Sequence, residues 1–210
     1  MEGSCEIKTL SGMGMTLGNV LRKVALTQLD SWRPVAFSVG TNSNVITAGD
    51  NVVEDMVEFA SSLSKMHFTV DTDKPAYVLT FDTSCLKVSD FETDKVHVFS
   101  NDDREILHTV SGTITVTVFL RNGKGSYSAK ENEKFLKDSP DTAGLCNNAV
   151  EYLNSRHCDI ERPGFSVDKR EDCEIIYFHV DSLIDISADK IVSECCGILF
   201  DSFAENYDEG

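Results

Sequence analysis

The residue types that carry out most protein chemistry occur in this sequence, but their spacing does not form a recognisable active site. Gly12, Gly14 and Gly18 lack the spacing of a dinucleotide-binding turn, and residues 123–126 lack the first half of a phosphate-binding loop. A helix that starts at Thr16 could hold an anion, although a capped structural start is the favoured interpretation. We therefore expect no catalytic residue and no cofactor.

The cysteines and histidines are dispersed along the chain. The seven cysteines are odd in number and show no C-x-x-C spacing, which indicates free thiols in a reducing compartment such as the cytoplasm. His157, Cys158 and Cys146 come nearest to a metal cluster, but core or solvent-facing roles fit them better. Cys195 and Cys196 fall on a predicted helix, where packing is favoured over redox chemistry. We expect no bound metal ion.

The charge balance argues against a nucleic-acid-binding surface. Of the 210 residues, 35 are acidic and 19 are basic, so the formal net charge is −16. A chain this acidic repels phosphates unless it gathers its cations, and the pairs Arg22-Lys23 and Lys169-Arg170 are too small for that. No apolar run approaches the ~20 residues of a membrane span. We therefore expect no direct sequence-specific DNA contact and no membrane contact.

The segment Gly12–Leu26 is predicted to be a loop that leads into an amphipathic helix capped by Thr16. One face of this helix is apolar and consists of Leu17, Val20, Leu21, Val24 and Ala25. The other face places one leucine among polar and cationic side chains, namely Asn19, Arg22, Lys23 and Leu26. This second face is either a contact surface or a solvated face with a single exposed leucine.

Sequence periodicity predicts further elements along the chain. Period-two patterns indicate strands at 35–40, 67–70, 77–81, 96–99, 106–110, 114–120, 165–167 and 174–180. Helical periods predict a helix that Asp50 caps, a helix at 140–153 and a last helix that Ser187 caps. The apolar residues at helical spacing are Val53, Met56, Val57, Ala60 and Leu63 in the first of these, and the inward residues of the second are Leu145, Ala149, Val150 and Leu153. The apolar stripe of the last helix comprises Ala188, Ile191, Val192, Cys195, Leu199 and Phe203. Residues 129–138 are expected to form an exposed loop or a frayed helix.

This order of elements predicts an α+β fold in which one domain is inserted into another. Residues 1–40 and 160–210 would form a discontinuous domain of two helices and one sheet, and residues 41–159 an inserted, mainly antiparallel β domain. The helix stripes are wider than one sheet face requires. We therefore expect the helices to be buried against a second copy and the first domain to be a dimerisation domain.

The segment Gly12–Lys23 closely resembles the signature Gly-Phe-Gly-His-Thr-Leu-Gly-Asn-Ala-Leu-Arg-Arg of the bacterial RNA polymerase alpha subunit. Further segments resemble the amino-terminal region of that family in the same order, at 49–58, 63–70, 114–118, 121–127, 165–168 and 184–191. The resemblance therefore covers nearly the whole chain and is collinear.

The resemblance implies a non-catalytic subunit of a nucleotidyltransferase, the DNA-directed RNA polymerase. It would pair with itself or an alpha-like partner and form the platform on which the beta and beta-prime subunits assemble. The dimer interface would contain Leu17, Leu21, Val24, Ile191, Cys195 and Leu199. The large-subunit interface would contain Thr16, Gly18, Asn19, Arg22, Lys23 and Leu26.

The sequence departs from the family pattern at several points. Lys23 replaces the second arginine of the signature, the opening is shorter, and 155–175 aligns loosely. The chain ends at Gly210, so no carboxy-terminal DNA-binding domain is expected. Such a trimmed version would suit a viral polymerase in a host cytoplasm, an organellar one in a plastid, or a reduced genome. The alternative function is a stand-alone dimeric interaction module of the same fold without a polymerase partner.

Overall fold

The computed structural model describes residues 2–41, 44–45, 52–100, 103–146 and 150–205. The chain divides into two compact units, which we call the terminal unit (Met1–Asp30 with Cys158–Gly210) and the inserted unit (Ser31–His157). The described residues form four α-helices together with strands that all pair in the antiparallel sense. The predicted α+β class is confirmed.

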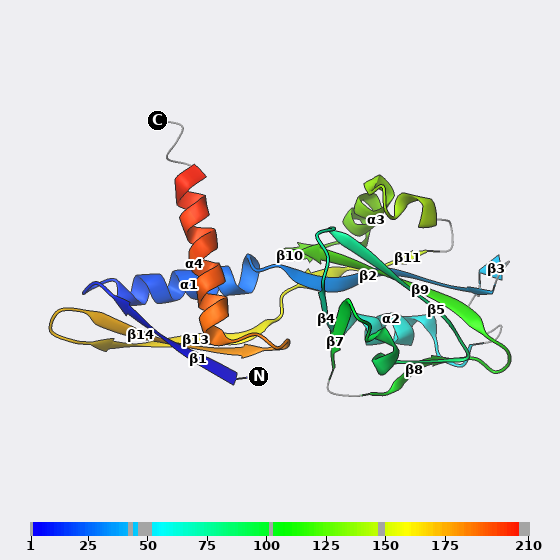
Figure 1. Ribbon diagram of the computed structural model, residues 1–210, viewed down its shortest axis with the longest axis horizontal. Helices are drawn as coiled ribbons and strands as arrows, with labels where there is room; N and C mark the ends of the chain where they lie inside the picture. Colours follow the sequence, from blue (N-terminus) through cyan, green and yellow to red (C-terminus); the bar gives the residue numbers. More distant parts are fainter. Residues whose placement is uncertain (1, 42–43, 46–51, 101–102, 147–149, 206–210) are drawn as a thin grey trace. The chain divides into compact units, whose positions relative to one another are not determined.

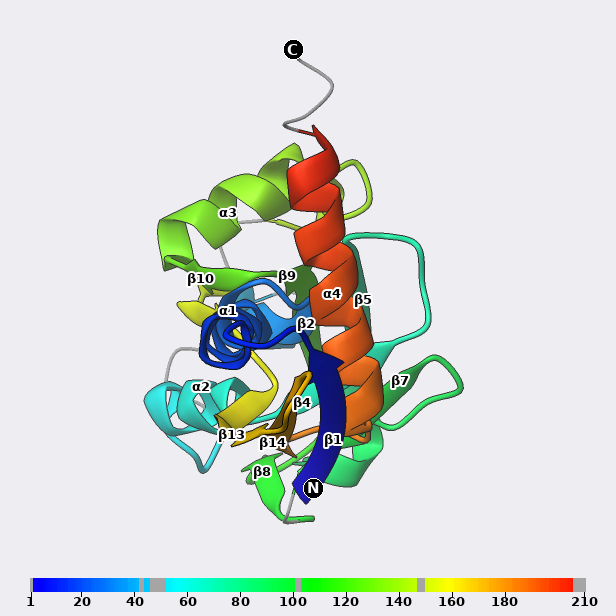
Figure 2. The ribbon, with the colours of Figure 1, turned by 90° about the vertical axis from the view of Figure 1, so that its left-hand side faces the viewer.

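The terminal unit is a three-stranded sheet with two helices on one face (Figure 1). Its described elements are β1 (Glu2–Thr9), α1 (Gly14–Thr27), β13 (Ile160–Lys169), β14 (Glu174–Ser182) and α4 (Ala188–Glu205). The strand order is β1-β14-β13, so a strand from the start of the chain pairs with one from its end. Figure 2 shows α1 nearly end-on beside this sheet.

The core of the terminal unit forms where both helices meet the sheet. Helix α1 contributes Leu21, Val24 and Ala25, and the strands contribute residues such as Phe178. Helix α4 contributes Ala188, Ile191, Val192 and Cys195. Its start is capped as predicted, because the Lys190 backbone N–H donates to the Ser187 hydroxyl at 3.3 Å.

Helix α1 lies unusually close to the sheet at Gly18. A Cβ atom built at this position would lie 2.4 Å from the ring of Phe165 on β13. A side chain here would therefore force the helix or the ring to move. Gly18 makes the close packing of α1 on β13 possible.

The inserted unit is built around a seven-stranded sheet in which β5, β9, β2, β4 and β7 are neighbours in that order. The short strands β3 and β11 also pair with β2, and two separate two-stranded sheets join β10 to β12 and β6 to β8. The first elements are β2 (Ser31–Thr41), β3 (Asn44–Val45), α2 (Met56–Ser64), β4 (His67–Val70), β5 (Ala76–Thr83), β6 (Cys85–Lys87) and the 3-10 helix η1 (Val88–Phe91). The remaining elements are β7 (Val96–Phe99), β8 (Glu105–His108), β9 (Ile114–Gly123), β10 (Gly125–Tyr127), α3 (Ala129–Asp138), the 3-10 helix η2 (Ala143–Leu145), β11 (Glu151–Tyr152) and β12 (Ser155–His157).

Helices cover both faces of this sheet (Figure 1 and Figure 2). On one face, Phe59 and Leu63 of α2 pack in the larger core, which also receives the inward residues of β9. On the other face, Leu136 of α3 packs with Phe119 of β9. The guanidinium carbon of Arg121 lies 3.6 Å from the ring centroid of Tyr127, so this turn region is held by stacking.

Residues 129–138 form α3, the helical one of the two alternatives predicted for them, because Ser128 and Glu131 make a reciprocal capping box at its start. Another element prediction in this unit is wrong. The helix expected at 140–153 is replaced by η2 and β11, and Leu145, predicted to face inward, is 48% exposed. Its predicted inward residue Ala149 lies outside the described residues.

Helix α2 starts later than expected. It begins at Met56, where the Asp55 side chain accepts a hydrogen bond from the Val57 backbone N–H at 3.0 Å. The predicted cap, Asp50, lies outside the described residues. Val53, which precedes the helix, and Val57, on its outward side, are 56% and 74% exposed, although their spacing placed both on the predicted apolar face.

The structural boundary between the units differs from the predicted one near residue 40. Residues 31–41 form β2, which pairs with β9 from Ser31↔Gly123 to Gly40↔Thr115. Strand β2 therefore belongs to the inserted unit, and the terminal unit keeps residues 1–30 and 158–210. The alternating pattern of 35–40 identified a strand but carried no information about its partner.

Replacement of Gly18 by alanine should destabilise the protein. Overpacking against Phe165 costs ~1–3 kcal/mol, which should exceed the ~1 kcal/mol that alanine gains in helix propensity. The matched control is Gly197→Ala on α4, where no atom lies within 4 Å of the added Cβ. Urea unfolding should show a lower midpoint for G18A and an equal or higher midpoint for G197A. Equal midpoints for the two variants would contradict the close packing at Gly18.

Candidate protein-binding surfaces of the terminal unit

The outward side of α1 carries a continuous strip of side chains, which we call the α1 face: Met15, Asn19, Arg22, Lys23 and Leu26. Their spacing places them on one side of the helix, opposite the core residues. Met15 is 58% exposed, and the Asn19 side-chain amide donates to the Met15 carbonyl at 3.0 Å. The strip therefore has an apolar and amide centre with one cation on either flank.

The two cations of the α1 face are available to a partner. The side chains of Arg22 and Lys23 are exposed, and within the described ranges neither makes an ion pair or a side-chain hydrogen bond. Arg22 can offer up to five N–H donors in a planar fork, and Lys23 offers a point charge.

Two residues predicted for this surface have other roles. Gly18 is buried against Phe165, so it faces the sheet and is not part of the exposed strip. Thr16 is exposed but is not the helix cap, because α1 begins at Gly14 with Met13 at the cap position and no side-chain cap bond from that residue. Sequence reasoning also missed Met15, whose apolar side chain at helical spacing from Leu26 was a usable signal.

The start of α1 is held by a residue from the other end of the chain. The backbone N–H of Gly14 donates to the Glu174 carboxylate at 2.7 Å, and Glu174 is only 4% exposed. A carboxylate at this end of a helix satisfies an unpaired N–H group and interacts favourably with the helix dipole. Glu174 was not among the residues predicted for this surface.

Most residues predicted for the dimer interface lie in the core of their own unit. Leu21, Val24, Ile191 and Cys195 are between 0% and 7% exposed. Leu17 and Leu199 are half-buried and keep part of their surface for a partner. The predicted dimer contact through these two residues stays a prediction.

The carboxy-terminal half of α4 exposes two aromatic side chains. Phe200 and Phe203 are each 73% exposed, and this end of the helix extends beyond the sheet (Figure 1). Phe203 belongs to the predicted apolar stripe, which is wider than one sheet face requires, and it is exposed because the sheet ends before the helix does. Two exposed phenylalanines beside the half-buried Leu199 form an apolar surface that solvent-facing helices rarely keep. We call Leu199, Phe200 and Phe203 the α4 end.

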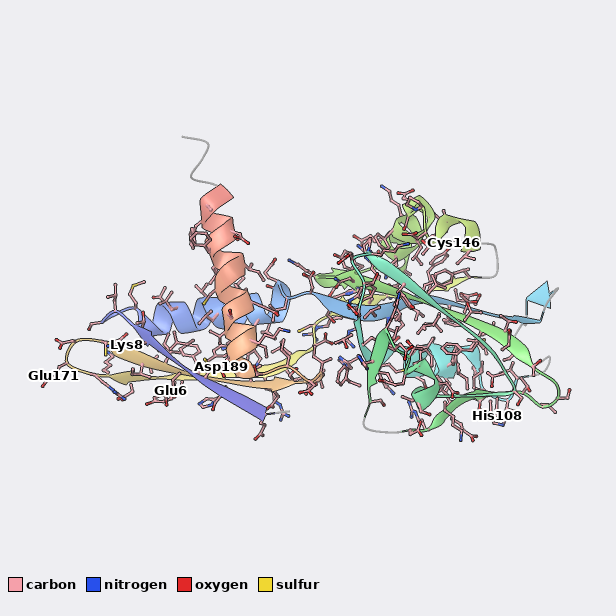
Figure 3. All side chains as sticks on the ribbon, in the orientation of Figure 1. Glu6, Lys8, His108, Cys146, Glu171 and Asp189 are labelled. Carbon is pink, nitrogen blue, oxygen red and sulfur yellow. The ribbon has the colours of Figure 1, made fainter. Side chains whose placement is uncertain are left out.

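The sheet face opposite the helices is charged. Glu6 and Lys8 of β1 are exposed and alternate with the core-facing Cys5 and Ile7 (Figure 3). Glu171 lies in the hairpin turn that joins β13 to β14 (Figure 3). This face offers charged positions that lie away from both the α1 face and the α4 end.

The thiols and histidines that came nearest to a metal cluster have structural partners. All seven cysteines are free thiols. The buried His157 ring lies 2.7 Å from the Ser31 carbonyl through Nδ1 and 2.9 Å from the Ser155 hydroxyl through Nε2. Cys146 packs in the smaller core of the inserted unit. Within the described residues, no group of three or more His, Cys, Asp and Glu side chains is arranged to hold a metal ion.

No described helix combines the length and the apolarity needed to cross a membrane.

The chain is similar in sequence to bacterial RNA polymerase alpha subunits, although no family model matches it. The DNA-directed RNA polymerase subunit alpha of Borrelia garinii subsp. bavariensis is 24% identical over 209 residues, which are 90% of this chain and 58% of the relative. That of Porphyromonas gingivalis is 24% identical over 212 residues, 96% of this chain and 63% of the relative. That of Nitratidesulfovibrio vulgaris is 29% identical over 125 residues, 58% of this chain and 36% of the relative. The predicted resemblance is confirmed, and the chain spans less than two thirds of the length of these relatives.

The adjacent thiols of α4 should differ sharply in reactivity. Burial raises the pKa of Cys195 to about 12, and neighbouring Cys196 and Glu194 act in the same direction. Cys195 should therefore stay protonated and shielded at pH 8, while the exposed Cys196 reacts with iodoacetamide. Tandem mass spectrometry of the native protein should find the label on Cys196, with C196S as the control that removes it. Equal labelling of both thiols would contradict the placement of α4 on the sheet.

Proposed function

We propose that this chain is a non-catalytic, alpha-type assembly subunit of a DNA-dependent RNA polymerase. The observation that carries the proposal is the similarity to named alpha subunits over 90% or more of the chain. It is supported by the exposed α1 face, which lies on the segment that carries the family signature. The nucleotidyl transfer itself would take place on the large subunits.

The first task of such a subunit would be to dimerise through the terminal unit. The α4 end presents two exposed aromatic rings and a half-buried leucine, and a second copy of the same surface would bury all three. Burial of one phenylalanine side chain contributes ~1.5–3 kcal/mol to the free energy of association. In a two-fold symmetric interface each contact occurs twice. The half-buried Leu17 of α1 would add to this contact.

The second task would be to hold the large subunits on the α1 face. A partner segment that covers Met15 and Leu26 gains apolar burial, while Arg22 and Lys23 can bond carboxylates or carbonyls at the rim. Lys23 would make less directional contacts than an arginine, because an ammonium group lacks the planar fork. Each dimer presents this face twice, so the beta and beta-prime subunits would each meet one copy.

The net charge fits a subunit that does not bind DNA by itself. With 16 more negative than positive charges, the isolated chain would be repelled by the phosphate backbone at moderate salt. Any contribution to DNA binding would come from the assembled polymerase. Regulation through this chain would therefore act on assembly.

Substitutions on the α1 face should release the large subunits and leave the dimer intact. In purifications from the native source, tagged R22A or L26D should recover at least tenfold less of the beta and beta-prime chains than the unaltered protein, since a buried partner contact is lost. Mass spectrometry identifies the recovered chains, and light scattering reports the dimer.

The matched controls make the same kinds of substitution, loss of a cation and gain of an acid, at positions outside the α1 face. K8A removes an exposed cation from the charged sheet face, and V110D places an acid at a side chain that is 75% exposed. Both should recover the large subunits normally. Normal recovery with R22A and L26D would refute the assignment of the α1 face, and a dimer that never carries a large subunit would favour the stand-alone module.

A charge at the α4 end should dissociate the dimer. We expect F203D to raise the dimer dissociation constant about 100-fold or more, because two apolar contacts are lost and two carboxylates would be buried. Analytical ultracentrifugation measures the constant, and circular dichroism checks that the monomer keeps its fold. V110D serves again as the control. An unchanged constant in a folded F203D protein would show that the dimer, if formed, uses another surface.

A further inference from the structure

Glu174 lies at the end of the terminal-unit sheet where β1 and β13 finish and β14 begins. Glu174 is the first residue of β14 and pairs with Thr9, the last residue of β1, and with Lys169, the last residue of β13. Its side chain is turned inward, is 4% exposed and accepts the Gly14 backbone N–H at 2.7 Å. Burial of a carboxylate costs free energy unless hydrogen-bond donors compensate for the lost water. The Gly14 N–H group is such a donor, so the buried position of Glu174 depends on this hydrogen bond.

Glycine at position 14 is what lets the carboxylate reach the backbone. A Cβ atom on Gly14 would lie 2.6 Å from Val167 Cγ1 and 2.8 Å from Glu174 Oε2. Any side chain there would push the carboxylate away from the N–H group. Gly14, the second glycine of the signature, therefore has a steric role. The residue at the cap position, Met13, makes no side-chain hydrogen bond to the helix, so the Gly14 N–H group is satisfied by Glu174 instead.

The turn that precedes α1 is exposed and apolar. The Met13 N–H donates to the Leu10 carbonyl at 3.1 Å, and Gly12 takes a positive φ of 84° inside this turn. Leu10 is 76% exposed, Met13 40% and Met15 58%. These are three of the nine exposed large hydrophobic side chains among the described residues, and they lie within six positions of one another. We call Leu10, Met13 and Met15, which lie in this turn and the first turn of α1, the apolar turn.

We propose that Glu174 is a positioning residue for partner binding, which holds the start of α1 so that the apolar turn is presented together with the α1 face. This inference rests on the proposed function and deepens it, because it adds a second contact element for the same large subunit. Met15 belongs to both sets, so the two surfaces are continuous. Leu10 and the two methionines offer an adaptable apolar contact that suits an apolar groove on the partner.

The test compares E174A and E174Q with the unaltered chain. The probe is the purified beta-type subunit that copurifies with the unaltered chain, and the affinity is measured by biolayer interferometry. E174A removes the acceptor and should weaken binding about tenfold. E174Q keeps an acceptor and the volume of the side chain, and should weaken binding only about threefold. The matched control is E171Q in the exposed hairpin turn, which should bind normally.

Hydrogen exchange separates positioning from general destabilisation. In E174A, the amides of residues 10–17 should exchange faster, while those of α4 and the dimer dissociation constant stay unchanged. Binding by E174A equal to that of the unaltered chain would overturn this inference but not the proposed function. Loss of protection throughout the terminal unit in both Glu174 variants would also overturn it, because the role would then be structural. Failure of the unaltered chain to carry any beta-type subunit would overturn the proposed function as well.

Discussion

The close contact between α1 and the edge of its sheet is the constraint on which the terminal unit depends. Gly14 and Gly18 remove the side chains that would keep the helix away from β13, so Val167 and Phe165 can pack against the helix backbone. Leu21, Val24 and Ala25 then join the core that α4 shares. Because the helix is anchored so firmly on one side, its other side can hold exposed cations and apolar groups without a loss of order.

This arrangement gives the surface of the terminal unit three regions of different chemistry. The α1 face combines a methionine, a leucine, an asparagine and two cations that make no ion pair with the described residues, a mixture that suits a partner with both apolar and acidic groups. The α4 end is purely apolar and suits a copy of itself. The charged sheet face discourages further association. In the inserted unit, helices on both sides of the sheet and the stacked Arg121 provide rigidity instead.

Local signals predicted the elements whose stabilising groups are close in sequence. The helical period of 17–25 and the Ser187 cap identified α1 and α4, and the alternation of 114–120 identified β9. The same reasoning placed Phe203 on the apolar stripe of α4, but periodicity does not reveal where the supporting sheet ends. It also chose Thr16 as the cap of α1, since the carboxylate that binds the helix start lies 160 residues away. Of the candidate site, the cations and Leu26 were readable from the sequence, whereas Glu174 required the strand register.

The pairing of β1 with β14 determines the order in which the chain can fold during synthesis. The inserted unit, residues 31–157, is continuous and emerges from the ribosome complete. The first thirty residues emerge earlier, yet β1 has no strand to pair with and α1 has no carboxylate at its start until residue 174 and those that follow have been made. The oldest part of the nascent chain is therefore among the last to become ordered. The outward side of α1 therefore takes its final position only after the strands that follow the inserted unit have been made.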